Sequence, residues 1–207
     1  QQAAAPTSGL QRLKASRCKP ANLRAWSMTS CTTKRVICWL SATTSVSVAG
    51  TPVTYDLLAS EARLCSFVAI AQGQLPQESW FALGRLLTTA GGEPILLSWS
   101  GSMFEYLMPL LVMPTYENTL LDQTCQAAVE RQIAYGKQRG VAWGMSESGY
   151  NTVDVRLNYQ YRAFGVPGLG LKRGLAEDLV IAPYASALAL MVAPEAACLN
   201  LQRLAAL

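Results

Sequence analysis

The sequence of 207 residues contains no histidine. Ser-His and Cys-His catalysis are therefore excluded, as is any metal site that depends on imidazole. The six cysteines are 13, 7, 27, 60 and 73 positions apart, so no C-x-x-C pair exists and no spacing is typical of a zinc or redox centre. We interpret them as buried or free thiols of a reducing compartment. We expect neither a metal ion nor a cofactor in this chain.

The sequence also lacks a long hydrophobic run. Its longest mostly apolar stretch, Tyr184–Ala193, is well short of the roughly 18 residues that a membrane-spanning helix needs. No signal-peptide pattern opens the chain, and the chain does not begin with methionine, so we interpret it as a fragment. With 51% hydrophobic residues it can bury the core of one domain.

Acidic residues are missing from the first 50 positions, which hold seven of the 17 basic residues. The remainder carries ten basic residues and all 13 acidic ones, so the formal charge of +4 hides a mildly acidic body. A nucleic-acid partner is therefore not expected, because phosphate binding needs a basic surface. A basic arm that binds nucleic acid or membrane stays a minor alternative for residues 1–50, which lack aromatic interleaving and an amphipathic period.

Residues 1–50 form an atypical segment, rich in Ser, Thr, Ala, Lys and Arg, and we place a domain boundary at their end. One interpretation is a disordered tail. The other is translation out of frame: codons permitted for Ser27–Val46, read from two nucleotides further on, give a far more protein-like string. Sequencing the source DNA tests this, because a single insertion or deletion should restore the string.

From Tyr55 to Gly73 the apolar residues recur at three- and four-residue spacing, which predicts a helix. Glu61 falls on the apolar face of this predicted helix. A carboxylate that points into a core is unfavourable unless it is paired or used. Two interpretations stay open: an ion pair, with Arg63 or with a partner helix, and a catalytic or substrate-binding carboxylate.

The other expected elements make the fold class mainly α, with one short β-hairpin. The predicted hairpin turns at residues 90–94, and the predicted helices span 102–113 (interrupted at Pro109), about 119–138 (ending at Gly140), 184–192 and 194–207. The glycines between residues 165 and 174 do not have the G-x-G-x-x-G spacing, so we expect no nucleotide site there.

The stretch from Trp143 to Tyr161 has neither a helical nor a strand period, so we expect irregular backbone on a surface or in a cleft. Glu147 lies among small residues that would let a ligand approach its carboxylate. The aromatic residues of the stretch are Trp143, Tyr150, Tyr159 and Tyr161, flat surfaces that suit sugar rings. The alternative is a surface loop with a solvated glutamate.

Four segments carry a resemblance to a known family. They are YDLLASEARL (55–64), SWSGSMFEYLMP (98–109), WGMSES (143–148) and YQY (159–161). In this order they resemble the central glycoamylase-like domain of bacterial cyclic β-1,2-glucan synthases, and the similarity runs from about Tyr55 to Leu207. Ala142 and Met145 depart from the Pro and Ile expected there, without touching a reactive group.

The resemblance implies that residues 51–207 are part of an α/α toroid of helical hairpins, a barrel whose central cleft handles β-1,2-glucan. It implies that this domain cyclises the linear glucan by retaining transglycosylation. UDP-glucose would be the donor only in a separate transferase domain of the parent protein. The parent would lie in the bacterial inner membrane, with this domain soluble and cytoplasmic and linked to the membrane only through the rest of the parent.

Retaining glycosyl transfer needs one carboxylic acid to protonate the leaving oxygen and a second carboxylate to form the glycosyl-enzyme, without histidine or metal. The resemblance makes Glu147 the acid/base and Glu61 the nucleophile. It places Glu105, Asp56, Trp99, Trp143 and Tyr150 along the sugar sites. Two other functions stay open: a non-catalytic carbohydrate-binding helical module, and a hydrolase similar to an endo-β-1,2-glucanase.

Overall fold

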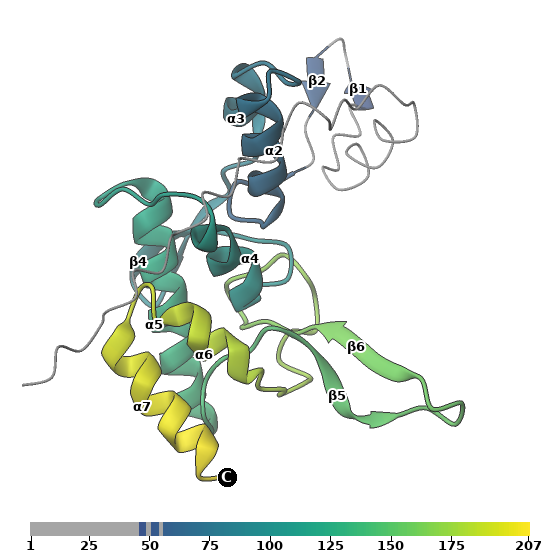
Figure 1. The fold of residues 1–207 in the computed structure, drawn as a ribbon, viewed down its shortest axis with the longest axis vertical. Helices are drawn as coiled ribbons and strands as arrows, with labels where there is room; N and C mark the ends of the chain where they lie inside the picture. The colour runs from purple at the N-terminus through teal and green to yellow at the C-terminus, as the bar shows by residue number, and fades with distance from the viewer. Residues whose placement is uncertain (1–45, 49–50, 54–55) are drawn as a thin grey trace, which may run out of the picture.

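The computed structural model describes residues 46–48, 51–53 and 56–207 (Figure 1). The α-helices of this part are α2 (Ala62–Ala71), α3 (Glu78–Ala82), α4 (Met103–Leu107), α5 (Leu120–Arg139), α6 (Pro183–Ala189) and α7 (Pro194–Ala205). The strands pair as antiparallel hairpins: β1 (Val46–Val48) with β2 (Thr51–Val53), β3 (Leu87–Ala90) with β4 (Glu93–Leu96), and β5 (Glu147–Val153) with β6 (Tyr159–Ala163).

The mainly helical class predicted from the sequence is confirmed for the described residues. The predictions for residues 1–50 fall outside them, apart from strand β1. No helix of the described part combines the length and the apolar character that a bilayer crossing requires.

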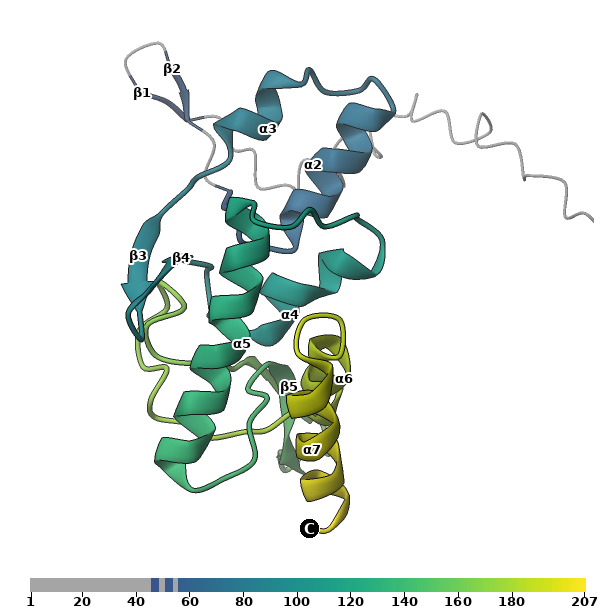
Figure 2. The same ribbon diagram turned by 90° about the vertical axis from the view of Figure 1, so that its left-hand side faces the viewer.

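Helix α5 is the longest helix of the described residues, and it packs against β4 and α4 (Figure 2). It begins where the Thr119 hydroxyl accepts a hydrogen bond from the Asp122 N–H (3.3 Å), and it ends at Gly140, whose φ of 69° is left-handed. One stripe of small and medium side chains, including Ala128 and Val129, is buried against β4 and α4. The prediction for 119–138 is therefore confirmed.

Helix α4 lies between α5 and α6, and α6 in turn packs on α7. Ser102 caps α4 in a capping box with Glu105, and Pro109 turns its continuation into a 3-10 helix, η2 (Met108–Leu111). Tyr106 of α4 is buried in the core, and its hydroxyl donates to the carbonyl oxygens of Leu96 (2.9 Å) and Leu169 (2.7 Å). The core thus joins β4, α4 and the loop before α6.

The helix predicted from Tyr55 starts later, at Ala62, with Glu61 as its N-cap residue. The preceding residues pair with another segment instead: the Leu58 N–H donates to the Gly84 carbonyl (2.9 Å), and the Gly84 N–H donates to the Asp56 carbonyl (2.8 Å). Leu57 and Leu58 are buried by these tertiary contacts rather than by a helical face. Hydrophobic spacing does not distinguish the two cases.

The stretch from Glu147 to Tyr161, expected to be irregular, forms most of the β5–β6 hairpin. The hairpin extends away from the helices (Figure 1). Ser, Gly and Asn weaken any strand signal within β5, and the pairing register shifts between Gly149 and Val153, which removes the alternation that a sequence pattern detects. The expectation of irregular backbone was therefore wrong.

The glycines between residues 165 and 170 allow two loops to touch backbone to backbone. The Ser98 N–H donates to the Leu169 carbonyl (3.0 Å), and the Lys172 N–H donates to the Trp99 carbonyl (2.8 Å). A Cβ on Gly165 would lie 1.9 Å from the Ser100 carbonyl oxygen. This glycine cluster supports the loop that carries Trp99.

Substitution of Gly165→Ala should lower the free energy of unfolding by about 2 kcal/mol or more, because backbone atoms must move to admit the methyl group. Gly168→Ala is the matched control. No atom lies within 4 Å of the Cβ position of Gly168, whose φ is +91°, so only left-handed strain of about 1 kcal/mol is expected. Urea unfolding followed by tryptophan fluorescence measures both variants, and equal losses would contradict the close packing.

Candidate active site

Two glutamates from other elements, Glu105 and Glu147, lie close enough to Glu61 to influence it electrostatically. Burial raises the pKa of Glu61 above its usual value, and the charges of Glu105 and Glu147 raise it further. The backbone N–H of Glu61 and the Ser60 hydroxyl oppose this shift. The structure therefore brings together the two carboxylates to which catalytic roles were assigned.

Glu61 is held at the start of α2 by the residues beside it. The Ser60 hydroxyl donates to Glu61 Oε2 (3.1 Å). Arg63, only 2% exposed, donates to the carbonyl oxygens of Ser60 (3.0 Å), Glu105 (3.0 Å) and Tyr106 (2.6 Å). The guanidinium thus fastens the start of α2 to α4, and it forms no ion pair with Glu61 in the described part of the chain.

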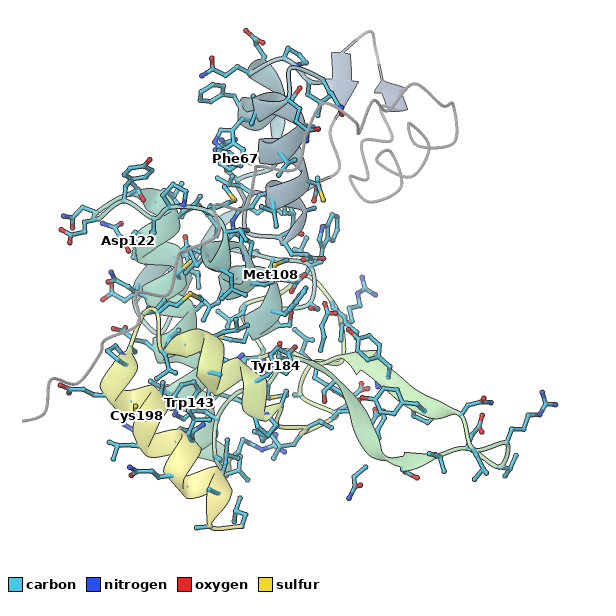
Figure 3. The ribbon with its side chains drawn as sticks, in the orientation of Figure 1. Phe67, Met108, Asp122, Trp143, Tyr184 and Cys198 are labelled. Atoms are coloured by element: carbon cyan, nitrogen blue, oxygen red, sulfur yellow. The ribbon has the colours of Figure 1, made fainter. Side chains whose placement is uncertain are left out.

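Glu147 is the first residue of β5, and tyrosines hold it from two directions. The Tyr161 hydroxyl donates to Glu147 Oε2. The Tyr184 hydroxyl, at the start of α6 (Figure 3), donates to the Glu147 carbonyl oxygen (2.7 Å) and lies 2.8 Å from Ser146 Oγ. Ser146 Oγ also accepts from the Phe104 N–H (2.9 Å), which ties Glu147 to α4.

Two buried amides fix the segment that leads into Glu147. Gln132 of α5 bonds both backbone groups of Met145: the amide nitrogen donates to the carbonyl (2.8 Å), and the amide oxygen accepts from the N–H (2.9 Å). Asn200 of α7 does the same for Trp143, at 2.7 and 3.2 Å. Because alternate residues are held from two helices, the position of Glu147 is set by the core.

Trp143 itself is buried in that core, near α7 (Figure 3), and it packs against Gly136 of α5. In this arrangement its ring offers no open face to a sugar, contrary to what its aromatic character suggested. Tyr150 is half-buried, because its ring meets Phe164 edge to face with centroids 5.0 Å apart.

Glu105 is 3% exposed, and its carboxylate is saturated with hydrogen bonds. Its donors are the hydroxyls of Ser98, Ser100 and Ser102 and the backbone N–H groups of Trp99, Ser100 and Ser102, at 2.6–3.2 Å. No acceptor capacity is left for a sugar hydroxyl. In this structure the residue shapes the 98–102 loop rather than lining an open sugar site.

Trp99 belongs to this loop, and its side chain lies beside Asp56. The Trp99 ring is 43% exposed and suits a stacked sugar. Burial raises the pKa of Asp56, an effect that the Leu57 N–H and the Trp99 indole oppose. Asp56 Oδ1 accepts from Leu57 N–H (2.8 Å), while the buried Oδ2 has no hydrogen-bond partner in good geometry among the described residues.

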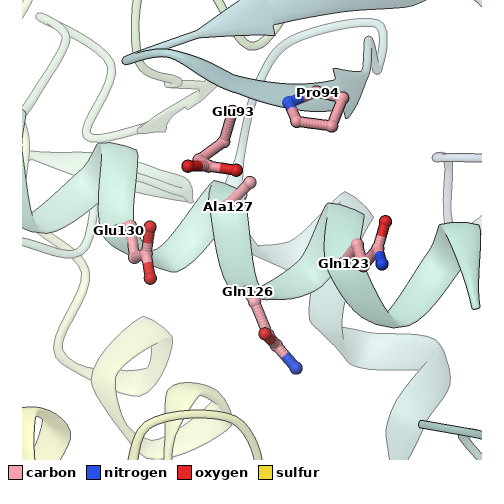
Figure 4. A pocket seen from close by; sticks show the side chains of 6 residues that line it. All are labelled: Glu93, Pro94, Gln123, Gln126, Ala127 and Glu130. Atoms are coloured by element: carbon pink, nitrogen blue, oxygen red, sulfur yellow. The ribbon is translucent and has the colours of Figure 1, made fainter. Parts of the chain in front are cut away.

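Two surface hollows lie away from Glu61 and Glu147. One of about 380 Å³ lies between β4 and α5, with Glu93 and Glu130 on its walls (Figure 4). The other, of about 620 Å³, is mostly apolar and is lined by α2, α3 and residues 113–121. Within the described ranges, no three His, Cys, Asp or Glu side chains gather where they could hold a metal ion.

Sequence reasoning missed Tyr184, Gln132 and Asn200 as residues that position the site. Gln132 carried a usable signal, since it interrupts an otherwise apolar stripe of α5. A buried amide there needs a partner. The hydrogen bonds of Tyr184 and Asn200 reach residues 37 and 57 positions away in the sequence, and no local pattern reveals such contacts.

Two neighbouring carboxylates are the groups that enzymes use to cleave or transfer glycosidic bonds, so carbohydrate chemistry is the class that this site fits. The model of the glycoamylase family, described as "Putative glucoamylase", matches residues 54–207, and the chain belongs to this family. The chain is also 56% identical over 150 residues to the cyclic beta-(1,2)-glucan synthase NdvB of Rhizobium meliloti (strain 1021). That alignment covers 72% of this chain and 5% of the relative, and it confirms the resemblance seen in the motifs.

Proposed function

We propose that this chain contributes the ring-closing site of a cyclic β-1,2-glucan synthase, acting on linear β-1,2-glucan by retaining transglycosylation. The observation that carries the proposal is that Glu61 and Glu147 belong to different elements and lie close enough for Glu147 to add to the raised pKa of Glu61, which burial mainly causes. Two carboxylates are what this chemistry needs.

In the first step a carboxylate oxygen of Glu61 bonds to the anomeric carbon while the glycosidic bond breaks, and the leaving oxygen takes a proton from Glu147. Formation of the ester removes the negative charge on Glu61. Burial and the charge of Glu105 oppose that charge, and Glu147 itself becomes charged as it gives up its proton, so removal of the charge on Glu61 is favoured by the surroundings.

In the second step the 2-hydroxyl at the other end of the same glucan attacks the anomeric carbon. The proton of this hydroxyl moves to Glu147, and the bond between the anomeric carbon and Glu61 breaks. The new glycosidic bond closes the ring. The Tyr161 hydroxyl, which donates to Glu147 Oε2, would orient the carboxyl group through both steps. Trp99 would contact the sugar rings, the buried Asp56 would support it rather than touch the sugar, and the half-buried Tyr150 would support the wall.

The identity to NdvB and the 5% coverage of that relative support assignment to a larger synthase. Other regions of that synthase would elongate the glucan from UDP-glucose at the inner membrane. Residues 51–207 would be part of a glycoamylase-like α/α toroid, completed by helices from elsewhere in that protein. The domain itself would lie in the cytoplasm.

Glu147→Gln in the complete synthase should reduce ring formation by about 10²–10⁴-fold, because an amide cannot protonate the leaving oxygen. Elongation from UDP-glucose should continue, so linear glucan should accumulate. Mass spectrometry distinguishes the products, since a ring is lighter than its linear counterpart by one water. Glu130→Gln, at an exposed position of α5, is the control. Normal ring formation by E147Q would contradict the proposal, and linear products from the wild type would indicate a hydrolase.

A further inference from the structure

The β5–β6 hairpin carries two tyrosines whose surroundings differ from those of core aromatics. Tyr159 and Tyr161 of β6 are 66% and 58% exposed. Residues two apart on a strand point to the same face, so the two rings share one side of the hairpin. Tyr161 lies opposite Gly149, and Glu147 is two residues before Gly149 on the paired strand. The tyrosine pair and Glu147 therefore occupy one continuous face.

Gly149 makes room for this arrangement. A Cβ at Gly149 would lie 2.1 Å from Cζ of Tyr159, so the Tyr159 ring lies directly over the glycine backbone. Any other residue would push the ring away from the strand. The missing side chain thus lets Tyr159 lie across β5, between the outer part of the hairpin and Glu147.

The turn that joins the two strands is held by its own polar contacts. Asp154 accepts hydrogen bonds from the backbone N–H groups of Arg156 (2.8 Å) and Asn158 (2.9 Å) and from the Asn158 amide (3.0 Å). These bonds keep the pKa of the exposed Asp154 below its usual value, the Asn158 side chain contributing most. A hairpin ordered in this way offers its face without much loss of entropy on binding.

We propose that Tyr159 and Tyr161 form a platform on which glucose rings of the linear glucan stack next to Glu147. The inference rests on the proposed function, and it adds a binding site remote from the bond that reacts. Pyranose rings present apolar C–H faces that stack on aromatic rings, and tyrosine supplies such a surface together with a polar edge. The platform would hold the part of the chain that leads away from the carboxylates.

The two tyrosines have different tasks in this arrangement. Tyr159 makes no hydrogen bond to a catalytic carboxylate and contributes through its ring. Tyr161 contributes its ring and also donates its hydroxyl to Glu147, which makes it a positioning residue. Removal of the Tyr161 hydroxyl alone should therefore affect turnover more than binding.

The test is calorimetric titration of the complete synthase with linear β-1,2-glucan, with Glu61→Gln present in the reference protein and in every variant to prevent turnover. Tyr159→Ala should weaken binding about tenfold, as expected when one stacked ring is lost. Tyr159→Phe should bind like the reference protein, because it keeps the ring. Tyr116→Ala is the matched control: Tyr116 is 67% exposed but lies in the 113–121 region, away from the hairpin. Circular dichroism verifies that each variant is folded.

Gly149→Ala gives a second route to the same result, since it should displace the Tyr159 ring and weaken binding while every aromatic residue is kept. Tyr161→Phe should retain the affinity, while ring formation slows when the same substitution is made in the complete synthase with Glu61 intact. Equal affinity of Y159A and the reference protein would overturn the platform and leave the proposed function standing. Absence of any binding by the reference protein would overturn both.

Discussion

Glu61→Gln in the complete synthase is expected to lower ring formation by about a thousandfold or more, since the amide cannot form the glycosyl-ester intermediate. The effect should appear in kcat and in kcat/KM alike, because the covalent bond forms only along the reaction path. Binding of linear β-1,2-glucan should persist in this variant. Ring formation is measured from the cyclic product released per unit time, and binding is measured by titration.

The same substitution is expected to stabilise the folded chain near neutral pH. The pKa of Glu61 is raised in the folded state above its ordinary value of 4.5, mainly by burial, so the folded state binds this proton more tightly than the unfolded state does. The free energy of unfolding should therefore fall as the pH rises from about 4.5 through the raised pKa. The E61Q substitution removes this loss of stability. The difference in free energy of unfolding between E61Q and the wild type should therefore vanish below about pH 4.5 and be largest above the raised pKa of Glu61.

Glu78→Gln is the matched control for both measurements. Glu78 also lies at the start of a helix, α3, but it is exposed. E78Q should change neither ring formation nor the pH dependence of stability by more than a small amount. An E61Q protein that closes rings at the normal rate would exclude Glu61 as the nucleophile. An E61Q protein with the same pH dependence of stability as the wild type would show that folding does not raise the pKa of Glu61.

The helices predicted from the sequence are those whose ends carry local signals. Thr119 and Gly140 bound α5, and Pro194 begins α7, so capping chemistry within a few residues defines each element. The helix expected from Tyr55 failed at its start because contacts with Gly84, more than 20 positions away, hold residues 56–58. Such contacts leave no trace in local hydrophobic spacing.

The candidate carboxylates could be singled out from the sequence, whereas the residues that support them could not. Glu61 and Glu147 were recognisable, one from an apolar pattern and the other from its small neighbours. Whether a polar or aromatic side chain faces solvent or the core depends on elements from the whole chain. Trp143, expected along the sugar sites, is clamped by Asn200 of α7 and lies in the core.

Substitution of Glu105 can distinguish a carboxylate that binds sugar from one that holds the fold. Its oxygens accept from three serine hydroxyls and three backbone N–H groups of the 98–102 loop, all in a buried setting. Glu105→Ala would leave these donors without an acceptor and would remove the capping box of α4. Each unsatisfied buried donor is unfavourable by about 1–3 kcal/mol, although local rearrangement recovers part of this.

We therefore expect E105A to lower the free energy of unfolding by at least about 3 kcal/mol in urea titrations, among the largest losses for a single side chain. E105Q should give an intermediate loss, since the amide keeps one acceptor oxygen but turns its NH₂ toward the serine donors. Glu117→Ala, at an exposed position, should stay within about 0.5 kcal/mol of the wild type. If E105A instead unfolds like the wild type and loses only glucan binding, Glu105 contacts the sugar directly, as the sequence suggested. If it unfolds early, the carboxylate acts by holding the loop that presents Trp99 beside Asp56.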